Sequence, residues 1–319
     1  MRGFVQRTGL LVFIAFLAMA FRPPNPEEAL RAIGSTRGLP IILQRAFDPG
    51  TDFALIPAPK PGDWLAEHPE NGQTFDDFIR LSPTKPDTPR AKIYLQPLGE
   101  FPEGRSVPLE TLKAYATAFF AMDVKILPPV AVNGSQLRTR INPYSRNRQL
   151  FTPDILMFLR SRLALDAFCL LAITMEDLYP DPSWNFVFGQ ASLRDRVGVF
   201  SFARYDPAFY REERGKDYQE VLVRRTCKVL THEIGHMFSL HHCIFFRCVM
   251  NGSNHLQESD ARPLSLCPVC LRKLHFSIGF DVADRYRKLL WFYQRAGFDP
   301  ETRWVANRLK KIVGNDEGK

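Results

Sequence analysis

Four of the seven histidines and two of the six cysteines lie within residues 231–250, THEIGHMFSLHHCIFFRCVM. His232 and His236 are four positions apart, so on a helix their imidazoles lie about 40° apart around the axis and about 6 Å apart along it, and both can reach one metal ion. Glu233 lies beside them and is not needed as a ligand. The spacing therefore predicts a metal site on a helix, with a carboxylate next to the metal.

A third histidine, His242, follows His232 by ten positions. On a continuous helix the two would lie about 15 Å apart, far beyond the roughly 2 Å of a zinc–nitrogen bond. The helix must therefore end and reverse near Ser239. The neighbouring His241 is the alternative third ligand if the reversal is displaced by one residue, although the spacing favours His242.

The sequence HEIGHMFSLHH followed by Met250 resembles the extended motif of the metzincin metallopeptidases, His-Glu-x-x-His-x-x-Gly-x-x-His with a methionine turn further along. The cysteines that follow narrow the resemblance to the archaemetzincins, which carry a cysteine cluster around this turn. The resemblance is close over residues 185–286 and weak before Lys92. It implies an α/β (α+β) fold, with a mixed twisted sheet, an active-site helix, a methionine turn at Met250 and a zinc knuckle formed by four cysteines.

The chain departs from the motif at the position of its glycine, where it has Ser239. A left-handed backbone conformation, which glycine adopts freely, would cost serine about 1–2 kcal/mol. We expect zinc ligation to hold that strain in place.

Four cysteines near the histidines supply a second set of metal ligands: Cys243, Cys248, Cys267 and Cys270. The last pair has the Cys-x-x-Cys spacing that suits one tetrahedral zinc ion. Disulfide bonds are the alternative, which an exported protein would favour. The resemblance favours zinc, so we expect two zinc ions per chain, one catalytic and one structural. Because Cys243 follows His242 directly, the structural ion would fix the loop that holds the catalytic one.

Three neutral histidines leave a zinc ion one open position for water, whose pKa falls from 15.7 to about 7. We expect Glu233 to act as the general base and Met250 to form an apolar floor under the histidines. The resemblance implies that the chain is a zinc-dependent metallopeptidase. As in similar metzincins, its peptide or protein substrate would lie extended along a strand edge, for which we expect the strand predicted at 197–203. The alternative function is that of a zinc-stabilised binding or scaffold protein. A third interpretation, a hydrolase that acts on non-peptide amides, is not excluded by these residues.

The N-terminus has two arginines and then an apolar run over residues 9–21 that contains Ala18-Met19-Ala20. This is the pattern of a secretory leader, so we expect export to the periplasm or the exterior and a mature chain that begins near Phe21. The leader would make transient membrane contact. The run is shorter than the roughly twenty residues that span a bilayer, and an uncleaved membrane anchor at residues 9–21 is the alternative.

The chain has 319 residues, 45% of them apolar, and a net charge of +8 that is spread along the sequence. It carries no nucleic-acid-binding motif, so we expect no nucleic acid partner. We also expect a monomer. Composition divides it into the leader (1–20), a proline-rich, loop-rich segment with little regular structure (21–90), a metzincin-like catalytic domain (91–286) and a helical extension (287–319).

Apolar runs and helical periodicity predict the elements of the catalytic domain. Strands are expected at 92–98, 124–127, 168–174, 185–189 and 197–203, and helices at 109–120, 154–163 and 220–237. Two further helices are expected at 281–295 and 300–313. Of the other candidate residues, we expect ordinary packing or surface positions for His68, His275, Cys169 and Cys227. His255 is left open, with a position near the metal or the substrate as the less favoured of its two interpretations.

Overall fold

The computed structural model describes residues 21–132 and 137–314. The leader predicted at residues 1–20 lies outside these ranges, as does nearly all of the alternative anchor. Among the described helices, none is both long and apolar enough to cross a bilayer.

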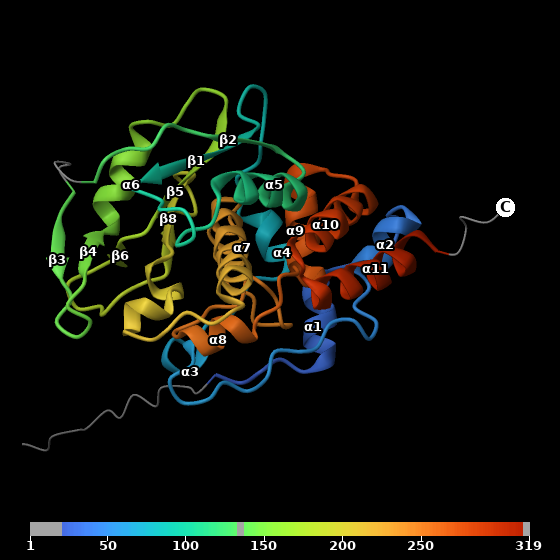
Figure 1. Cartoon of the computed structure of the whole chain (residues 1–319). Helices are drawn as coiled ribbons and strands as arrows, with labels where there is room; N and C mark the ends of the chain where they lie inside the picture. The colour runs from blue at the N-terminus through green and yellow to red at the C-terminus, as the bar shows by residue number, and fades with distance from the viewer. Residues whose placement is uncertain (1–20, 133–136, 315–319) are drawn as a thin grey trace, which may run out of the picture.

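A five-stranded mixed sheet has the order β2-β1-β5-β8-β7, and only β7 runs antiparallel to its neighbour. In Figure 1 this sheet lies between α6 and α7. The central strand β5 is buried throughout, which fits its nearly continuous apolar sequence because both faces of the sheet are covered. The predicted α/β class and mixed sheet are confirmed. The strands are β1 (Lys92–Leu98), β2 (Asp123–Ile126), β5 (Ala167–Thr174), β7 (Gly189–Ala191) and β8 (Val197–Ser201).

A second, three-stranded sheet has the order β3-β4-β6 and was not predicted. Its strands are three or four residues long, which is too short for a recognisable alternation of apolar and polar residues. They are β3 (Thr139–Ile141), β4 (Arg148–Phe151) and β6 (Asp177–Tyr179).

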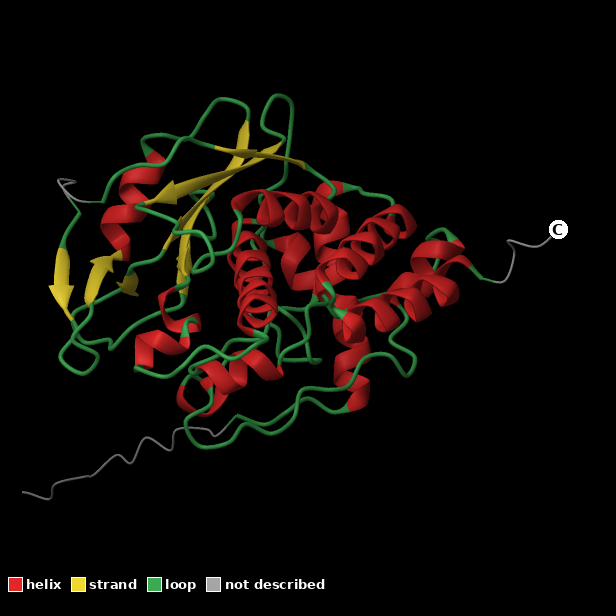
Figure 2. Cartoon of the chain, in the orientation of Figure 1, coloured by secondary structure: helices red, strands yellow, loops and turns green. Residues whose placement is uncertain are grey.

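Helices cover both faces of the larger sheet (Figure 2). The helices α5 (Leu109–Phe120) and α7 (Tyr218–Met237) pack on one face, and α6 (Thr152–Arg160) packs on the other. The larger apolar core lies between the sheet and the first two helices, and a smaller one lies under α6. All three helices agree with the predicted ranges to within a few residues, and α7 carries the first two histidines.

The C-terminal third is helical and continues the larger core (Figure 1). The predicted boundary between residues 286 and 287 falls inside α10, which packs on both α5 and α11. Two 3-10 turns, η1 (Ala203–Tyr205) and η2 (Pro207–Tyr210), precede α7. The helices that follow α7 are α8 (Leu256–Ala261), α9 (Pro268–Ile278), α10 (Val282–Ala296) and α11 (Asp299–Val313).

The proline-rich segment contains more regular structure than its composition predicts, because it forms four short helices, three of which pack on the C-terminal ones. Capping boxes at Asn25 and Thr74 begin two of them, and each helix buries apolar side chains such as Phe47 and Phe78. The four are α1 (Pro26–Ile33), α2 (Ile41–Phe47), α3 (Trp64–Glu67) and α4 (Phe75–Arg80).

Candidate metal centres and catalytic site

The active-site helix α7 ends where the histidine spacing requires it to end. Ser239 has φ 66°, in the left-handed region. Its N–H donates to the carbonyl oxygen of His236 (2.8 Å), and the N–H of Leu240 donates to that of Gly235 (3.2 Å). These two hydrogen bonds form a Schellman motif, which reverses the chain after the helix. The Ser239 hydroxyl also accepts a hydrogen bond from the backbone N–H of Thr84 (3.1 Å), which offsets part of the strain.

The reversal brings His242 beside the two helical histidines. One ring nitrogen from each of His232, His236 and His242 lies within 4.8 Å of the others, and the Nε2 atoms of the first two are 3.0 Å apart. A tetrahedral zinc ion with bonds of about 2.05 Å would place two ligands about 3.3 Å apart, which is close to this distance. His241, the alternative third ligand, is not part of the group.

Each of the three imidazoles has a hydrogen-bond acceptor at Nδ1. The acceptors are the carbonyl oxygen of Val249 for His232 (3.0 Å), that of Leu240 for His236 (2.7 Å) and the carboxylate of Glu70 for His242 (2.8 Å). A proton held on Nδ1 leaves the lone pair of each Nε2 free for a metal ion. The three Nε2 atoms are therefore the ligand set that this geometry offers, and neutral nitrogen donors suit zinc.

Burial keeps the first two imidazoles neutral. It lowers the pKa of His232 well below its ordinary value and the pKa of His236 to about 3, and neighbouring positive charge acts in the same direction. Neutral imidazoles bind a metal without first losing a proton, so neither ligand resists metal binding at pH 7.

Glu233 lines a cleft of about 460 Å³ that is also lined by the three histidines. A Cβ atom on Gly189 would come within 2.5 Å of its Oε1, so the carboxylate lies directly against the backbone of β7. Burial raises the pKa of Glu233 to about 8, although the positive charge of Arg262 acts to lower it. A dication on the histidines would favour the charged carboxylate and lower this pKa again.

Met250 packs beneath the active-site helix and is fully buried. A Cβ atom on Gly235 would come within 2.5 Å of the Met250 sulfur, so the position between the two helical histidines has room only for glycine. The role of Met250 as an apolar floor under the metal ligands stays a prediction.

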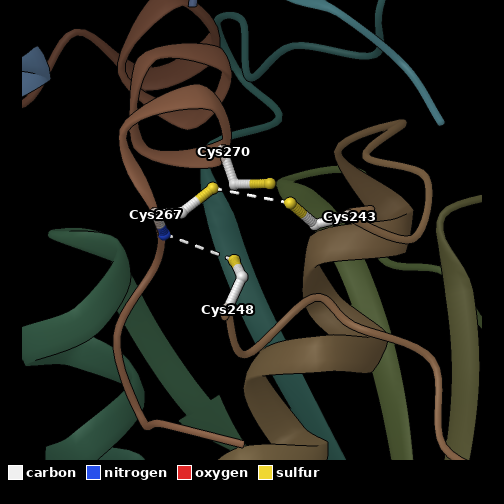
Figure 3. Close-up of side chains that lie close together, drawn as sticks. All are labelled: Cys243, Cys248, Cys267 and Cys270. Atoms are coloured by element: carbon white, nitrogen blue, oxygen red, sulfur yellow. Dashed lines mark hydrogen bonds between the residues drawn. The ribbon is translucent and has the colours of Figure 1, made fainter. Parts of the chain in front are cut away.

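The four cysteines converge on one buried point (Figure 3). The Cys243 and Cys267 sulfurs are 3.5 Å apart, well beyond the roughly 2.05 Å of a disulfide bond. Four thiolates bound to zinc at about 2.3 Å would be separated by about 3.8 Å, so the geometry favours the zinc alternative. Burial and the neighbouring sulfurs raise the pKa of Cys267. Although burial acts in the same direction on Cys243, hydrogen bonds from the other cysteines lower its pKa.

One loop joins the two candidate metal groups. The N–H of Met250 donates to the Cys248 sulfur (3.5 Å), and the carbonyl of the intervening Val249 accepts from His232. Asn251 closes the loop, because its side chain accepts from the N–H of Cys248 (2.7 Å) and donates to the carbonyl of Cys243 (2.7 Å). A displacement of the cysteine group would therefore move the backbone that supports the histidines.

His255 and His68 lie near the site without joining the group of three. His255 caps α8: its Nδ1 accepts from the N–H of Glu258 (3.3 Å), and its Nε2 lies 3.0 Å from a carboxylate oxygen of Asp63. Although these three side chains lie close enough to hold a metal ion, both ring nitrogens are already occupied. His68 is not a simple loop residue, since its ring lies 4.3 Å from Trp64 and stacks on Trp184 at 5.6 Å.

Sequence comparison identifies relatives of known class. The sequence model of peptidase family M54 matches residues 142–276. Archaemetzincin-2 of Macaca fascicularis is 43% identical over 277 residues, which cover 78% of this chain and 77% of that protein. Human Archaemetzincin-1 is 35% identical over 283 residues, covering 80% of this chain and 57% of that protein.

Two crystal structures are also similar. The archaemetzincin of Archaeoglobus fulgidus, complexed with malonate, is 32% identical and covers 57% of this chain and 99% of its own, with a TM-score of 0.42. The archaemetzincin of Methanopyrus kandleri is 27% identical and covers 60% of this chain and 97% of its own, with a TM-score of 0.46.

Proposed function

Because the chain belongs to the archaemetzincins of peptidase family M54, which are zinc metallopeptidases, we propose that it hydrolyses peptide bonds with Glu233 as the general base. His232, His236 and His242 would hold the catalytic zinc ion through their Nε2 atoms. The observation that carries the proposal is the convergence of three imidazoles in a cleft beside one buried carboxylate. Zinc bound there supplies a Lewis acid and lowers the pKa of a coordinated water to about 7.

Glu233 is placed to move protons in both directions. Its carboxylate lines the cleft beside the histidines, and no hydrogen bond within residues 21–132 and 137–314 engages its oxygens. It would take a proton from the attacking water and pass it to the leaving amine. Burial, which disfavours the charged carboxylate, makes the protonated form accessible between the two transfers.

The free edge of β7 offers a place for the substrate backbone. Phe188 and Ser192 hydrogen-bond to β8, so the main-chain groups of Gly189 and Ala191 point the other way, along the cleft that both residues line. An extended peptide would pair with these groups. The prediction that the substrate pairs with the strand at residues 197–203 was wrong, because β8 is already paired on both sides, with β5 and β7.

The four cysteines would hold a second, structural zinc ion, which gives two ions per chain. Four buried sulfurs leave no open position for a substrate or water, in contrast to the three histidines in their cleft. The shared loop explains why a structural ion would matter for activity, since it fixes the segment that carries His242.

A pair of variants on one helix tests the general base. Glu233→Gln should retain two zinc ions per chain by metal analysis and lose about 10²–10⁴-fold in turnover of a peptide library, because the amide cannot accept the proton. Glu220→Gln, an exposed position of the same helix, is the matched control and should match the parent. Turnover of Glu233→Gln within a few-fold of the parent would remove Glu233 from the mechanism. If the zinc-loaded parent cleaves no peptide, the alternative function, a zinc-stabilised scaffold protein, would be favoured over a peptidase.

A further inference from the structure

We propose that residues 62–73, which we call the N-terminal strap, complete the catalytic metal centre, and that Glu70 is the positioning residue for His242. The strap lies about 170 residues before that histidine in the sequence and outside residues 142–276, which the family model matches. The proposal rests on the proposed function in one respect only, the assignment of a metal ion to His242.

His242 differs from the other two candidate ligands in how its ring is held. His232 and His236 donate to backbone carbonyls, whereas His242 is paired with the side chain of Glu70. Glu70 Oε1 lies 2.8 Å from His242 Nδ1 and also accepts a hydrogen bond from Trp64 Nε1 at 2.7 Å. A carboxylate is the stronger acceptor, so it fixes the tautomer of His242 and makes Nε2 a better donor to a metal ion.

Trp64 closes the space around this pair. Its ring packs edge-on against the His242 ring with centroids 5.0 Å apart. A Cβ atom on Gly252 would come within 2.4 Å of the indole, so Trp64 fills the space beside the segment that follows Met250. The indole therefore packs against the imidazole and donates to the carboxylate that holds it, which restricts rotation of the His242 ring.

The first half of the strap is tied to the segment after the methionine turn. The backbone N–H of Trp64 donates to both carboxylate oxygens of Glu258 at 3.0 and 3.1 Å. Asp63 pairs with His255 at 3.0 Å, and the side chain of Asn254 donates to the carbonyl of Gly62 at 3.1 Å. His255 therefore anchors the strap to the segment that follows the methionine turn.

The other end of the strap is tied to the reversal after α7. The side chain of Gln73 donates to the carbonyl oxygen of Ser239 at 3.2 Å and accepts from the N–H of His241 at 3.3 Å. The ammonium of Lys273 donates in turn to the Gln73 side chain at 3.1 Å. Glu70 is therefore held between two anchored points, as pre-organisation of a metal ligand requires.

Zinc binding tests this role without using hydrolysis. In the full chain, Glu70→Ala should bind the more weakly held of the two zinc ions about 10–100-fold less tightly in competition with a chelator, and leave the other ion unchanged. Glu70→Gln should recover most of the lost affinity, because its amide oxygen still accepts from Nδ1. Glu213→Ala, which removes an exposed carboxylate outside the strap, is the matched control and should bind both ions like the parent.

A second readout separates positioning from general stability. Cobalt substituted at the histidine site should give a visible spectrum that changes in Glu70→Ala and not in Glu213→Ala, at temperatures where both variants are folded. Parent-like zinc affinity and a parent-like cobalt spectrum in Glu70→Ala would overturn the proposal. Failure of the proposed function would differ, because the parent itself would then bind one zinc ion or cleave no peptide.

Discussion

The backbone N–H of Cys243 donates to the carbonyl oxygen of Met250 across 2.9 Å. This hydrogen bond joins a member of the cysteine group to the residue beneath the active-site helix. Cys243 also follows His242 directly, so the two candidate metal groups share covalent and hydrogen-bonded links. Loss of the structural ion should therefore weaken the catalytic site as well as the fold.

Cys267→Ser tests that dependence. It should lose one zinc ion per chain, lower the thermal midpoint of unfolding and weaken the remaining ion, because the loop that carries His242 loosens. Metal analysis and thermal unfolding of the same sample measure these effects. Cys227→Ser, a buried cysteine of α7 outside the group, is the control and should lose stability while retaining both ions. Two tightly held ions in Cys267→Ser would show that the cysteine group is misassigned.

Gly189→Ala should disable catalysis without removing zinc. The new methyl group would lie 2.5 Å from Glu233 Oε1 and 2.9 Å from the carbonyl oxygen of Val199, so the carboxylate must move. We expect at least about a 10²-fold loss of turnover, the lower end of what a positioned general base contributes. Gly198→Ala perturbs the neighbouring strand through contacts of 3.0 Å and longer, and should keep most of the activity. Equal activity in the two variants would contradict this placement of Glu233.

Ser239 combines a strained backbone with a useful hydroxyl, and two substitutions separate these effects. Ser239→Ala keeps the left-handed conformation but loses the hydrogen bond from Thr84, so it should lower the free energy of unfolding by about 1 kcal/mol. Ser239→Gly loses the same bond but relieves about 1–2 kcal/mol of strain, so it should be at least as stable as the parent. Urea unfolding of the zinc-loaded proteins measures the order of stability of the parent and the two variants. A glycine variant less stable than the alanine variant would refute this explanation.

Lys228 predicts a pH dependence of stability. Its ammonium is buried and donates to the carbonyl oxygen of Asp260 (2.7 Å), and burial lowers its pKa from 10.5 to about 8. Between these two values the unfolded chain binds more protons than the folded chain, so the free energy of unfolding should rise with pH from about 8 to 10.5. Below pH 8 both states are protonated, and the contribution is constant.

Lys228→Met isolates this effect. The difference in the free energy of unfolding between parent and variant should shift in favour of the parent by on the order of 1–3 kcal/mol over that pH range. Chemical denaturation of the zinc-loaded proteins at several pH values measures it. A difference that does not change with pH would show that Lys228 titrates near its ordinary value.

The sequence predicts the histidine group well because its geometry is local. Helical spacing fixes His232 and His236, and the position of His242 requires the reversal that the structure shows at Ser239. The central strands and helices were predicted for a similar reason, since long periodic segments carry their own signal. The short helices after Asn25 and Thr74 also carried a local signal, their capping boxes, which proline content concealed.

The strap and the edge strand could not be predicted in this way. Glu70 and His242 are separated by about 170 residues, and no pattern in either segment indicates that they meet. The strand predicted at 185–189 was wrong in its bounds, because the structure has only the three-residue strand β7 (Gly189–Ala191) there, too short to carry a periodic signal of its own. In both cases the tertiary fold, rather than local propensity, decides the contact.

Anomalous diffraction at the zinc edge, from crystals of the zinc-loaded protein, tests the central claim most directly. We predict one peak about 2.0–2.1 Å from Nε2 of His232, His236 and His242, with the remaining position open to solvent, and a second peak among the four cysteine sulfurs. A first peak that lacks His242, or whose fourth position is filled by a protein side chain, would contradict a catalytic zinc site.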